Sequence, residues 1–578
     1  MLKEGDSANA IQQFLKSYDY ILSNNPIDHA QMGSIIYYLY KAYLNVGNYE
    51  LALNTYYTES LVPLPKKIAT WEKAKIFDES KTESTFYFMT IGYYSRVFYE
   101  KYKSQKNFSD LLFAKELLDS SMIYIQSETN VNDEDRLLSI FKNSEEVYDL
   151  GVLINNTLFN LKGEEKYLSD VYQCSEESKL KILYSLIHDK SEKQQTRAKI
   201  QRAIDSLVLS KNNSFDIIRM KNAIDSIGVP HQSNKEPGLL SKVQNRLDGD
   251  EVLIDYNIIN KELFIHYIYR DTSILYCRPF AEKEDRIIKT LINAQKDLNF
   301  TADMFRLVAQ DGFAILFPNS DLPYRITIIP DHQLLNLNFE ILKNDFSQDM
   351  IDSHMIVYSG SGHQYICTPN YTVEKLNTDI AAFFFSDENS INDATIILEE
   401  LPGNIPERQL IERQFSNAQI YSGKTNSKSQ FLKTITNHSF DIIHIATHGY
   451  ASEENAKDIR LYFRDDQYNL DSIYAYHILD QQLDANLVIL SACHSGAGLY
   501  YGGEGKFDWA RYFILSGAKS VISSLWDVDD RASKLIYNSF YSSKKASYEE
   551  KIREAKIQLK MNPNYSHPYY WAGFIYSS

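Results

Sequence analysis

The chain changes its pattern of apolar residues near Glu251, and this change constrains what it can fold into. Up to about residue 190, glycine and proline are sparse and apolar residues recur every three or four positions, which is typical of amphipathic helices. From Glu251 onward, short runs rich in β-branched and aromatic residues alternate with helical stretches. The sequence therefore predicts a helical N-terminal part followed by layers of strands and helices.

Helical hairpins are expected in the first part, and the clearest spans Ile35–Ser60 with a turn at Gly47-Asn48-Tyr49. Ala42 and Ala52 would let its two helices approach closely, while tyrosines fill the spaces between neighbouring hairpins. This pattern resembles a tetratricopeptide repeat, and a plain helical bundle is the alternative. Two degenerate copies are predicted at Phe86–Ile125 and Leu137–Ser178.

The second part reads as two α/β units. In the first we expect a helix at Lys289–Leu298, a strand pair turning at Asn260-Lys261, and strands within 273–280 and 325–342. The second unit begins near Asp379, and its apolar runs predict central parallel strands covered on both faces. These runs are TDIAAFFFS, AQIYSG, FDIIHIATHG, NLVILSAC and AKSVISSLW.

Composition narrows the functional classes. Apolar residues make up 44% of the chain and charged residues 24%, as in globular proteins, and the net charge of −16 disfavours direct DNA binding. No apolar run is long enough for a membrane helix, and the first residues lack a secretory pattern, so we expect a cytoplasmic protein without a membrane partner. The four cysteines have no CxxC spacing, which speaks against a disulfide framework or a structural zinc site.

Two of the predicted parallel strands end in reactive residues. The strand at 440–447 leads to His448-Gly449, and the strand at 486–492 leads to Cys493. Sites in open parallel sheets form beyond the carboxyl ends of strands, so both residues are expected on one edge. A thiol needs a nearby base to become a thiolate, and histidine suits that role. Small Gly449 would let a backbone N–H face a substrate carbonyl.

Packing is the competing explanation for each of these residues, because free cysteine is commonly a small core residue. His444 lies within its strand and favours a structural role. His494 adjoins Cys493 and would point to the other face, because successive residues of an extended chain alternate. Trp526 is compatible with simple core packing.

Six motifs follow one another along the chain: IPDHQLLNLNFEIL, LPGNIPERQLIERQF, HIATHG, LVILSACHSGAG, GEGKFDWARYFILSGAKSVISSLWDVDD and HPYYWAGFI. In this order they resemble the CHAT family of caspase-like peptidases, which is related to separase. The resemblance covers roughly residues 200–578 and implies a cysteine endopeptidase without a cofactor or catalytic metal, with His448 as general base and Cys493 as nucleophile. The N–H groups of Gly449 and Cys493 would form the oxyanion hole. The fold class it implies is a tetratricopeptide-like helical repeat arm followed by a caspase-like α/β fold.

The resemblance also divides the chain and assigns its remaining cysteines. It implies a pseudo-caspase subdomain at 248–378, in which Cys277 and Cys367 are packing thiols, and an active caspase-like subdomain at 379–578. Helical repeats at 1–190 and a connector at 191–247, with a break at Gly228-Val229-Pro230, precede them.

Substrate preference is open at the sequence level. Metacaspase-like sites carry an acid two residues before the cysteine, where this chain has Ser491. Separase-like sites take an acid from an LWDVxD stretch, which makes Asp529 the leading candidate and Asp527 the second. Either would favour Arg or Lys before the cut, whereas Leu or Met is expected if neither aspartate reaches the pocket. A solvated charge cluster that includes Asp530 is the alternative.

The sequence also predicts that the activity is regulated, and two other functions stay open. The chain shows no obvious cleavable prosegment, so we expect a largely latent enzyme that a protein or ribonucleoprotein activates through the arm. The glycine-dense segment GAGLYYGGEGKFD after Cys493 would be ordered at that step. A role in bacterial defence rests on analogy with the family. The alternatives are a catalytically silent scaffold and, with less support, a zinc hydrolase using His448, Cys493 and His494.

Overall fold

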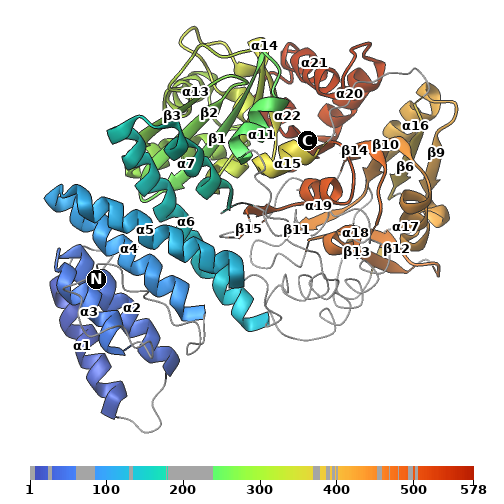
Figure 1. The fold of residues 1–578 in the computed structure, drawn as a ribbon. Helices are drawn as coiled ribbons and strands as arrows, with labels where there is room; N and C mark the ends of the chain where they lie inside the picture. The colour runs from blue at the N-terminus through green and yellow to red at the C-terminus, as the bar shows by residue number, and fades with distance from the viewer. Residues whose placement is uncertain are drawn as a thin grey trace. The chain divides into compact units, whose positions relative to one another are not determined.

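The computed structural model contains two compact units, residues 1–175 and residues 176–578 (Figure 1). Each unit is described by itself. The residues that the structure describes are 7–23, 29–59, 85–128, 134–177, 179, 238–368, 378–385, 391–392, 397–398, 401, 403–451, 459–467, 469–479, 481–491, 499–501 and 505–578.

All the secondary-structure elements described in the first unit are helices, joined by short turns. The three predicted hairpins are confirmed as the pairs α2 and α3, α4 and α5, and α6 and α7, and the first pair turns at Gly47, whose φ is 73°. The helices are α1 (Ser7–Ser23), α2 (His29–Asn45), α3 (Tyr49–Glu59), α4 (Thr85–Gln105), α5 (Phe108–Glu128), α6 (Glu134–Lys162) and α7 (Glu165–Glu177).

Small residues set the spacing of these helices. A β-carbon at Gly151 of α6 would lie 2.6 Å from the sulfur of Cys174 on α7, so only glycine fits there. Ala42 and Ala52 are fully buried where α2 meets α3. Close approach at small residues with aromatic filling is the packing predicted for a helical repeat.

An eleven-stranded sheet runs through the second unit in the order β3-β2-β1-β4-β5-β18-β17-β14-β10-β6-β9 (Figure 1). Its strands are β1 (Glu251–Ile259), β2 (Glu262–Ile268), β3 (Ser273–Pro279), β4 (Arg325–Ile329), β5 (Met355–Tyr358), β6 (Ile380–Phe384), β9 (Gln419–Ser422), β10 (Phe440–Ala446), β14 (Ala485–Leu490), β17 (Val521–Ser524) and β18 (Phe574–Ser577).

The sheet has two halves that run in opposite directions. Strands β1, β4, β5 and β18 are mutually parallel, and β17, β14, β10, β6 and β9 form the second parallel set. The halves meet where β18 pairs antiparallel with β17. Strands β1, β2 and β3 form an antiparallel meander, whose first turn at Asn260 and Lys261 has positive φ at both residues, as predicted.

Helices cover both faces of this sheet. A large buried cluster packs α12, α13, α16, α20 and α21 on one face, and Phe431 of α17 packs on the other face against Phe383. The helices are α11 (Leu239–Arg246), α12 (Glu282–Ala294), α13 (Ala302–Leu316), α14 (Met350–Ser353), α15 (Gly362–Cys367), α16 (Asn404–Gln414), α17 (Lys428–Asn437), α18 (Ala475–Leu479), α19 (Trp509–Leu515), α20 (Asp530–Ser542), α21 (Tyr548–Lys560) and α22 (Pro568–Trp571).

Short elements complete the unit. A three-stranded sheet follows β10, and two small hairpins lie elsewhere. The strands are β11 (Gly449–Ala451), β12 (Ile459–Arg464), β13 (Leu470–Tyr474), β7 (Ile391–Asn392), β8 (Ile397–Leu398), β15 (Leu499–Tyr501) and β16 (Gly505–Phe507), and the 3-10 turns are η2 (His332–Asn336), η3 (Phe339–Ile341) and η4 (Gly423–Thr425).

A buried ion pair links the segment that follows β4 to α21 and β18. Lys556 of α21 donates to both carboxylate oxygens of Glu340 at 2.6 and 2.7 Å, and to the Phe574 carbonyl at 3.2 Å. Asn338 donates to the Ala572 carbonyl at 2.6 Å. The segment 338–340, from the motif IPDHQLLNLNFEIL, thereby holds the end of the chain in the sheet.

The predicted fold class, helices followed by a mixed α/β sheet, is confirmed, and several details differ. The helix predicted at Lys289–Leu298 begins earlier, at Glu282, because three acidic residues fill its first turn. The segment 325–342 is a strand only to Ile329 and then forms 3-10 turns. The proposed subdomain boundaries stay predictions, and Gly228-Val229-Pro230 lies outside the described residues. Within the described part of the chain, no helix is long and apolar enough to cross a membrane.

Candidate active site

Strands β10 and β14 are direct neighbours and run parallel, with His444 opposite Ile489 and Ile445 opposite Leu490. The pairing continues past β14, since the backbone N–H of Ser491 donates to the Ile445 carbonyl at 2.8 Å. Both strands therefore end at the same edge of the sheet. The prediction that the strands leading to His448 and Cys493 share an edge is confirmed for the strands themselves.

His448 lies two residues beyond the end of β10 and is half-buried. Its backbone carbonyl accepts a hydrogen bond from the Tyr462 N–H at 3.0 Å, so β12 fixes the chain at this point. Its ring meets the Phe385 ring edge-on, with centroids 5.2 Å apart and planes at 78°. Gly449 opens β11 immediately after it and pairs with Leu461 of β12. The backbone that carries the His448 imidazole is thus held by β12 at the carboxyl edge of the sheet.

The predicted nucleophile, Cys493, lies outside the described residues, as do His494 and Gly496. The geometry of the predicted dyad and of the oxyanion hole therefore stays a prediction. The last described residue before Cys493 is Ser491, which is half-buried at the end of β14.

A buried carboxylate behind this edge was missed by the sequence reasoning. Glu407 of α16 is 3% exposed and accepts hydrogen bonds from the Ser491 hydroxyl at 3.2 Å to each of its two oxygens. Its Oε2 lies 3.4 Å from His444 Nε2, close enough for attraction but not an aligned hydrogen bond. We call Glu407, His444, Ser491 and Tyr541 the Glu407 cluster, because His444 Nδ1 lies 2.9 Å from the Tyr541 hydroxyl.

The sequence contained a signal for Glu407. It lies four residues before Ile411, which is fully buried on the same helix, so it belongs to the apolar face of α16. A charged residue on an apolar helix face requires a partner, which here comes from two strand ends. His444 is fully buried, in agreement with the structural role that its place within a strand favoured.

Helix α16 also contacts the ends of two strands through its first residue. The side-chain amide of Asn404 donates to the Phe385 carbonyl at 2.7 Å and to the Ala446 carbonyl at 3.1 Å. The Phe385 carbonyl comes directly after β6, and the Ala446 carbonyl belongs to the last residue of β10. The motif LPGNIPERQL therefore supplies two side chains that secure three strand ends beside His448.

The candidate specificity residues have the following surroundings. Asp529 is the N-cap of α20, where its Oδ1 accepts from the backbone N–H groups of Arg531 at 3.0 Å and Ala532 at 2.9 Å. Asp527 is exposed. Trp526 is 4% exposed and its indole N–H donates to the Tyr569 carbonyl at 3.0 Å, which fits core packing.

Burial and nearby charge raise the pKa of one aspartate and two tyrosines on α20. Burial, and then the charges of Asp529 and Glu407, raise the pKa of Asp530. Burial, and then the charge of Glu407, likewise raise the pKa of Tyr537 and of Tyr541 well above the usual range. Both phenols are therefore neutral hydrogen-bonding groups near pH 7.

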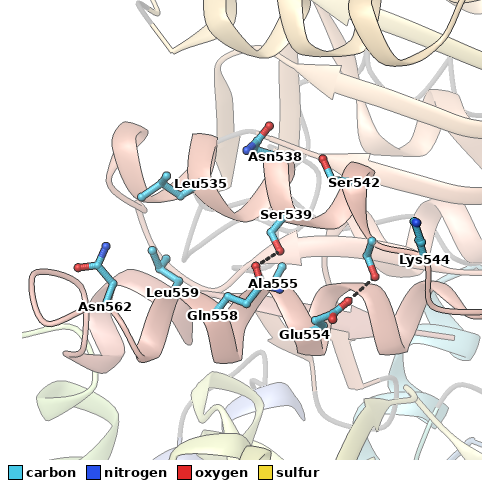
Figure 2. A pocket seen from close by; sticks show the side chains of 11 residues that line it. Leu535, Asn538, Ser539, Ser542, Lys544, Glu554, Ala555, Gln558, Leu559 and Asn562 are labelled. Carbon is cyan, nitrogen blue, oxygen red and sulfur yellow. Dashed lines mark hydrogen bonds between the residues drawn. The ribbon is translucent and has the colours of Figure 1, made fainter.

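A pocket of about 580 Å³ lies elsewhere, between α20 and α21 (Figure 2). Eight of its eleven lining residues are polar, and the hydrogen bond from Ser539 to Gln558, at 2.7 Å, bridges the two helices. None of its lining residues belongs to the Glu407 cluster or to the predicted dyad. The pocket is therefore separate from the predicted site. Among the residues that the structure describes, no group of three histidine, cysteine or acidic side chains could hold a metal ion.

Residues 304–578 match the model of the CHAT domain, so the predicted CHAT domain is confirmed over this segment. Two curated relatives are the proteins named tetratricopeptide repeat protein 28 of mouse and human. They are 36% and 35% identical over 104 and 105 residues, which is 17% and 18% of this chain. The matched part is 4% of the length of each relative.

Two of the solved structures that match this chain are the following. The separase–securin complex of Saccharomyces cerevisiae matches with a TM-score of 0.47 and 11% identity, covering 98% of this chain and 45% of that chain. The Arg-specific cysteine proteinase gingipain R of Porphyromonas gingivalis matches with a TM-score of 0.32 and 10% identity, covering 52% of this chain and 75% of that chain.

Proposed function

We propose, starting from the CHAT domain that residues 304–578 form, that this chain is a cysteine endopeptidase with Cys493 as nucleophile and His448 as general base. The observation that carries the proposal is the pairing of β10 with β14. His448 follows one strand by two residues, and Cys493 follows Ser491 by two residues. Reactive residues just beyond adjacent carboxyl ends are the arrangement that a thiol–imidazole pair requires.

The chemistry is acyl transfer in two steps. His448 takes the thiol proton, and the sulfur of Cys493 attacks the peptide carbonyl to form a tetrahedral oxyanion. The C–N bond breaks as His448 returns the proton to the leaving amine, which leaves a thioester. Water, deprotonated by His448, then attacks the thioester and releases the acid and the thiol. The N–H groups of Gly449 and Cys493 are the proposed donors to the oxyanion.

For the residue before the cut we propose Arg or Lys. Asp529 and Asp527 are the acids proposed to receive it, with Asp529 leading and with Ser491 lining the same pocket. An acid in such a pocket rewards a basic side chain through charge-assisted hydrogen bonds. A Leu or Met preference is the alternative if neither carboxylate reaches the substrate.

The proposed setting is regulated proteolysis in the cytoplasm. A protein or ribonucleoprotein bound to the helical arm would activate the enzyme on a protein substrate, and bacterial defence is the pathway that the family resemblance suggests. The arm offers tyrosine-rich helices, such as α2 and α4, of the kind that suits protein recognition.

The test compares proteolysis by the unaltered chain with Cys493→Ala and His448→Ala. We expect both variants to lose cleavage of a proteome, read by mass spectrometry of new N-termini, and to keep the melting temperature of the parent. Cys367→Ala, which removes an exposed cysteine outside the predicted dyad, is the matched control and should cleave normally. Persistent cleavage by purified Cys493→Ala protein would reject the proposal. Absence of cleavage by every form, with an unreactive Cys493, would favour the silent scaffold.

A further inference from the structure

We infer that Glu407 is a positioning residue of the proposed peptidase: one buried carboxylate aligns the strand end that leads to Cys493 with the strand that leads to His448. The inference rests on the proposed function and concerns the motif LPGNIPERQL, whose acidic residue has no part in the acyl-transfer steps. Its evidence is a set of contacts among described residues on α16, β10, β14 and α20.

Glu407 reaches both strands from one helix. It accepts from the Ser491 hydroxyl with both oxygens at 3.2 Å, and Ser491 is two residues before Cys493. Its Oε2 lies 3.4 Å from His444, which is four residues before His448. A side chain that contacts two neighbouring strands close to their ends restrains their relative register and tilt.

Burial makes this restraint strong. Glu407 is 3% exposed and His444 is fully buried, so water does not compete for their polar atoms. A buried carboxylate without hydrogen bonds would be costly, so the Ser491 hydroxyl is held toward it. The N–H of Ser491 is held at the same time by the Ile445 carbonyl at 2.8 Å. Ser491 is thus fixed by its backbone and by its side chain, immediately before the nucleophile segment.

His444 also connects the carboxylate to α20. Its Nδ1 lies 2.9 Å from the Tyr541 hydroxyl, and its Nε2 lies 3.4 Å from Glu407 Oε2 without an aligned hydrogen bond. The titratable groups around the carboxylate are His444 on β10 and Tyr537, Tyr541 and Asp530 on α20. Burial, and then the charge of Glu407, keep the two tyrosines neutral near pH 7.

The alternative is that Glu407 only stabilises the fold. A purely structural role would lower the melting temperature and the fraction of folded protein, while each folded molecule kept its normal thiol chemistry. A positioning role changes the chemistry within folded molecules. If Ser491 and His444 move by a fraction of an ångström, the thiol and the imidazole meet less well, and the thiolate is less favoured.

The experiment follows alkylation of Cys493 by iodoacetamide across pH in the full chain, by mass spectrometry of the peptide that carries it. This small reagent reports the thiolate and requires neither a substrate nor an activator. For the parent we expect reaction well above that of Cys367, with an inflection below the ordinary thiol pKa of about 8.5. For Glu407→Gln we expect a rate about 10- to 100-fold lower near pH 7 and an inflection moved up toward the ordinary value.

Two further variants isolate the contact. Glu412→Gln changes a half-exposed acid on the same helix, which pairs with Arg408 at 3.5 Å, and should behave as the parent. Ser491→Ala should slow alkylation in the same direction, and the double variant with Glu407→Gln should be no slower than Glu407→Gln alone, because both changes break one contact. Melting temperatures of all variants ensure that rates are compared on folded protein.

The outcomes separate the two proposals. A parent Cys493 that reacts no faster than Cys367 would reject the proposed dyad, and with it this inference. A reactive parent with an unchanged rate and inflection in Glu407→Gln would overturn the positioning role and leave the peptidase standing. Additive effects of Glu407→Gln and Ser491→Ala would also overturn it.

Discussion

Asp529 accepts a hydrogen bond from the backbone N–H of Ala532 at 2.9 Å, so the leading candidate for recognising a basic substrate residue is also the N-cap of α20. A cap side chain satisfies backbone donors that would otherwise lack partners. A substitution at this position therefore affects both stability and specificity, and a test must separate the two.

Serine separates the two roles, because it caps helices nearly as well as aspartate but carries no charge. We predict that Asp529→Ala lowers the free energy of unfolding by about 1 kcal/mol, whereas Asp529→Ser retains most of it. We also predict that Asp529→Ser loses preference for Arg or Lys before the cut. Denaturant titration and cleavage-site profiling measure these effects. An unchanged profile in Asp529→Ser would exclude Asp529 as the specificity acid, and a parent profile without Arg or Lys would exclude a basic preference.

The cysteines are predicted to differ widely in reactivity. Burial, and then the charge of Glu262, raise the pKa of Cys277 to about 12, so its thiolate is scarce near pH 7 even though the residue lies at the exposed edge strand β3. We expect Cys493 to be alkylated first and Cys277 last among the thiols of the CHAT-containing unit. The measurement is the time course of iodoacetamide labelling, resolved by peptide. Rapid labelling of Cys277 would contradict this order.

The pair of Lys556 and Glu340 gives a stability prediction. Both side chains are almost fully buried, and burial lowers the pKa of Lys556 in spite of its carboxylate partner. Lys556→Met should cost about 3–5 kcal/mol, because it leaves Glu340 buried without a partner. The double variant Lys556→Met with Glu340→Gln should recover much of that loss. Lys551→Met, on the same helix, is the control. A double variant as unstable as the single one would show that the charge itself is not the cause.

His266 makes stability depend on pH. Its burial lowers its pKa from 6.5 to about 4, and Lys179 adds to the decrease while Asp255 opposes it. Between these values the unfolded chain binds a proton that the folded chain does not, so stability falls as pH falls from about 6.5 to 4. The full effect is about 3 kcal/mol. His266→Asn should flatten this part of the stability curve, measured by denaturant titration at several pH values. An equal slope in both proteins would reject the assignment.

Local patterns predicted the parts of the fold that lie within one continuous segment. The turn at Asn260 and Lys261, the hairpin around Gly47, and strands β10 and β14 all follow from turn chemistry and apolar runs. Strand β18 was missed because it has only four residues, which is too short to show an alternating pattern after the aromatic run that precedes it. Its place between β5 and β17 is set by long-range pairing. Helix α13 was also missed, although Thr301 is a clear N-cap signal.

The candidate site could likewise be predicted only in part from the sequence. His448 and its neighbouring strand could be predicted because strand ends are visible in the sequence. Glu407 lies 84 residues before Ser491 and meets it only through the packing of α16 on the sheet. A single sequence shows the apolar face on which Glu407 lies but does not name its partner.

The last prediction is latency that is relieved through the arm. The glycine-dense segment after Cys493 loses much entropy on ordering, so its active arrangement is proposed to be a minor state at rest. A partner that binds the active state about a hundredfold more tightly supplies roughly 2.7 kcal/mol toward it. A small reagent needs only the thiolate, whereas a peptide also needs the ordered segment. In the isolated protein, Cys493 should therefore react readily with iodoacetamide but slowly with a peptide reagent.

We propose that the signal enters the second unit through Glu176 and Lys179. Glu176 accepts from the Gly362 N–H at 2.7 Å at the start of α15, and Lys179 forms a buried ion pair with Asp255. These residues directly follow the first unit along the chain, so they are the proposed link on which a bound partner acts. Glu176→Ala should weaken activation while leaving iodoacetamide labelling of Cys493 unchanged.

The measurement is acylation of Cys493 by a peptidyl acyloxymethyl ketone carrying Arg at its first position. We compare the full chain, the shortened chain 176–578 and Glu176→Ala, each with and without a candidate partner. Latency predicts slow acylation of the full chain alone, acceleration by the partner, and little acceleration in Glu176→Ala or in the shortened chain. Equal and rapid acylation in every case would rule out latency, because the arm would then serve only to recruit substrate.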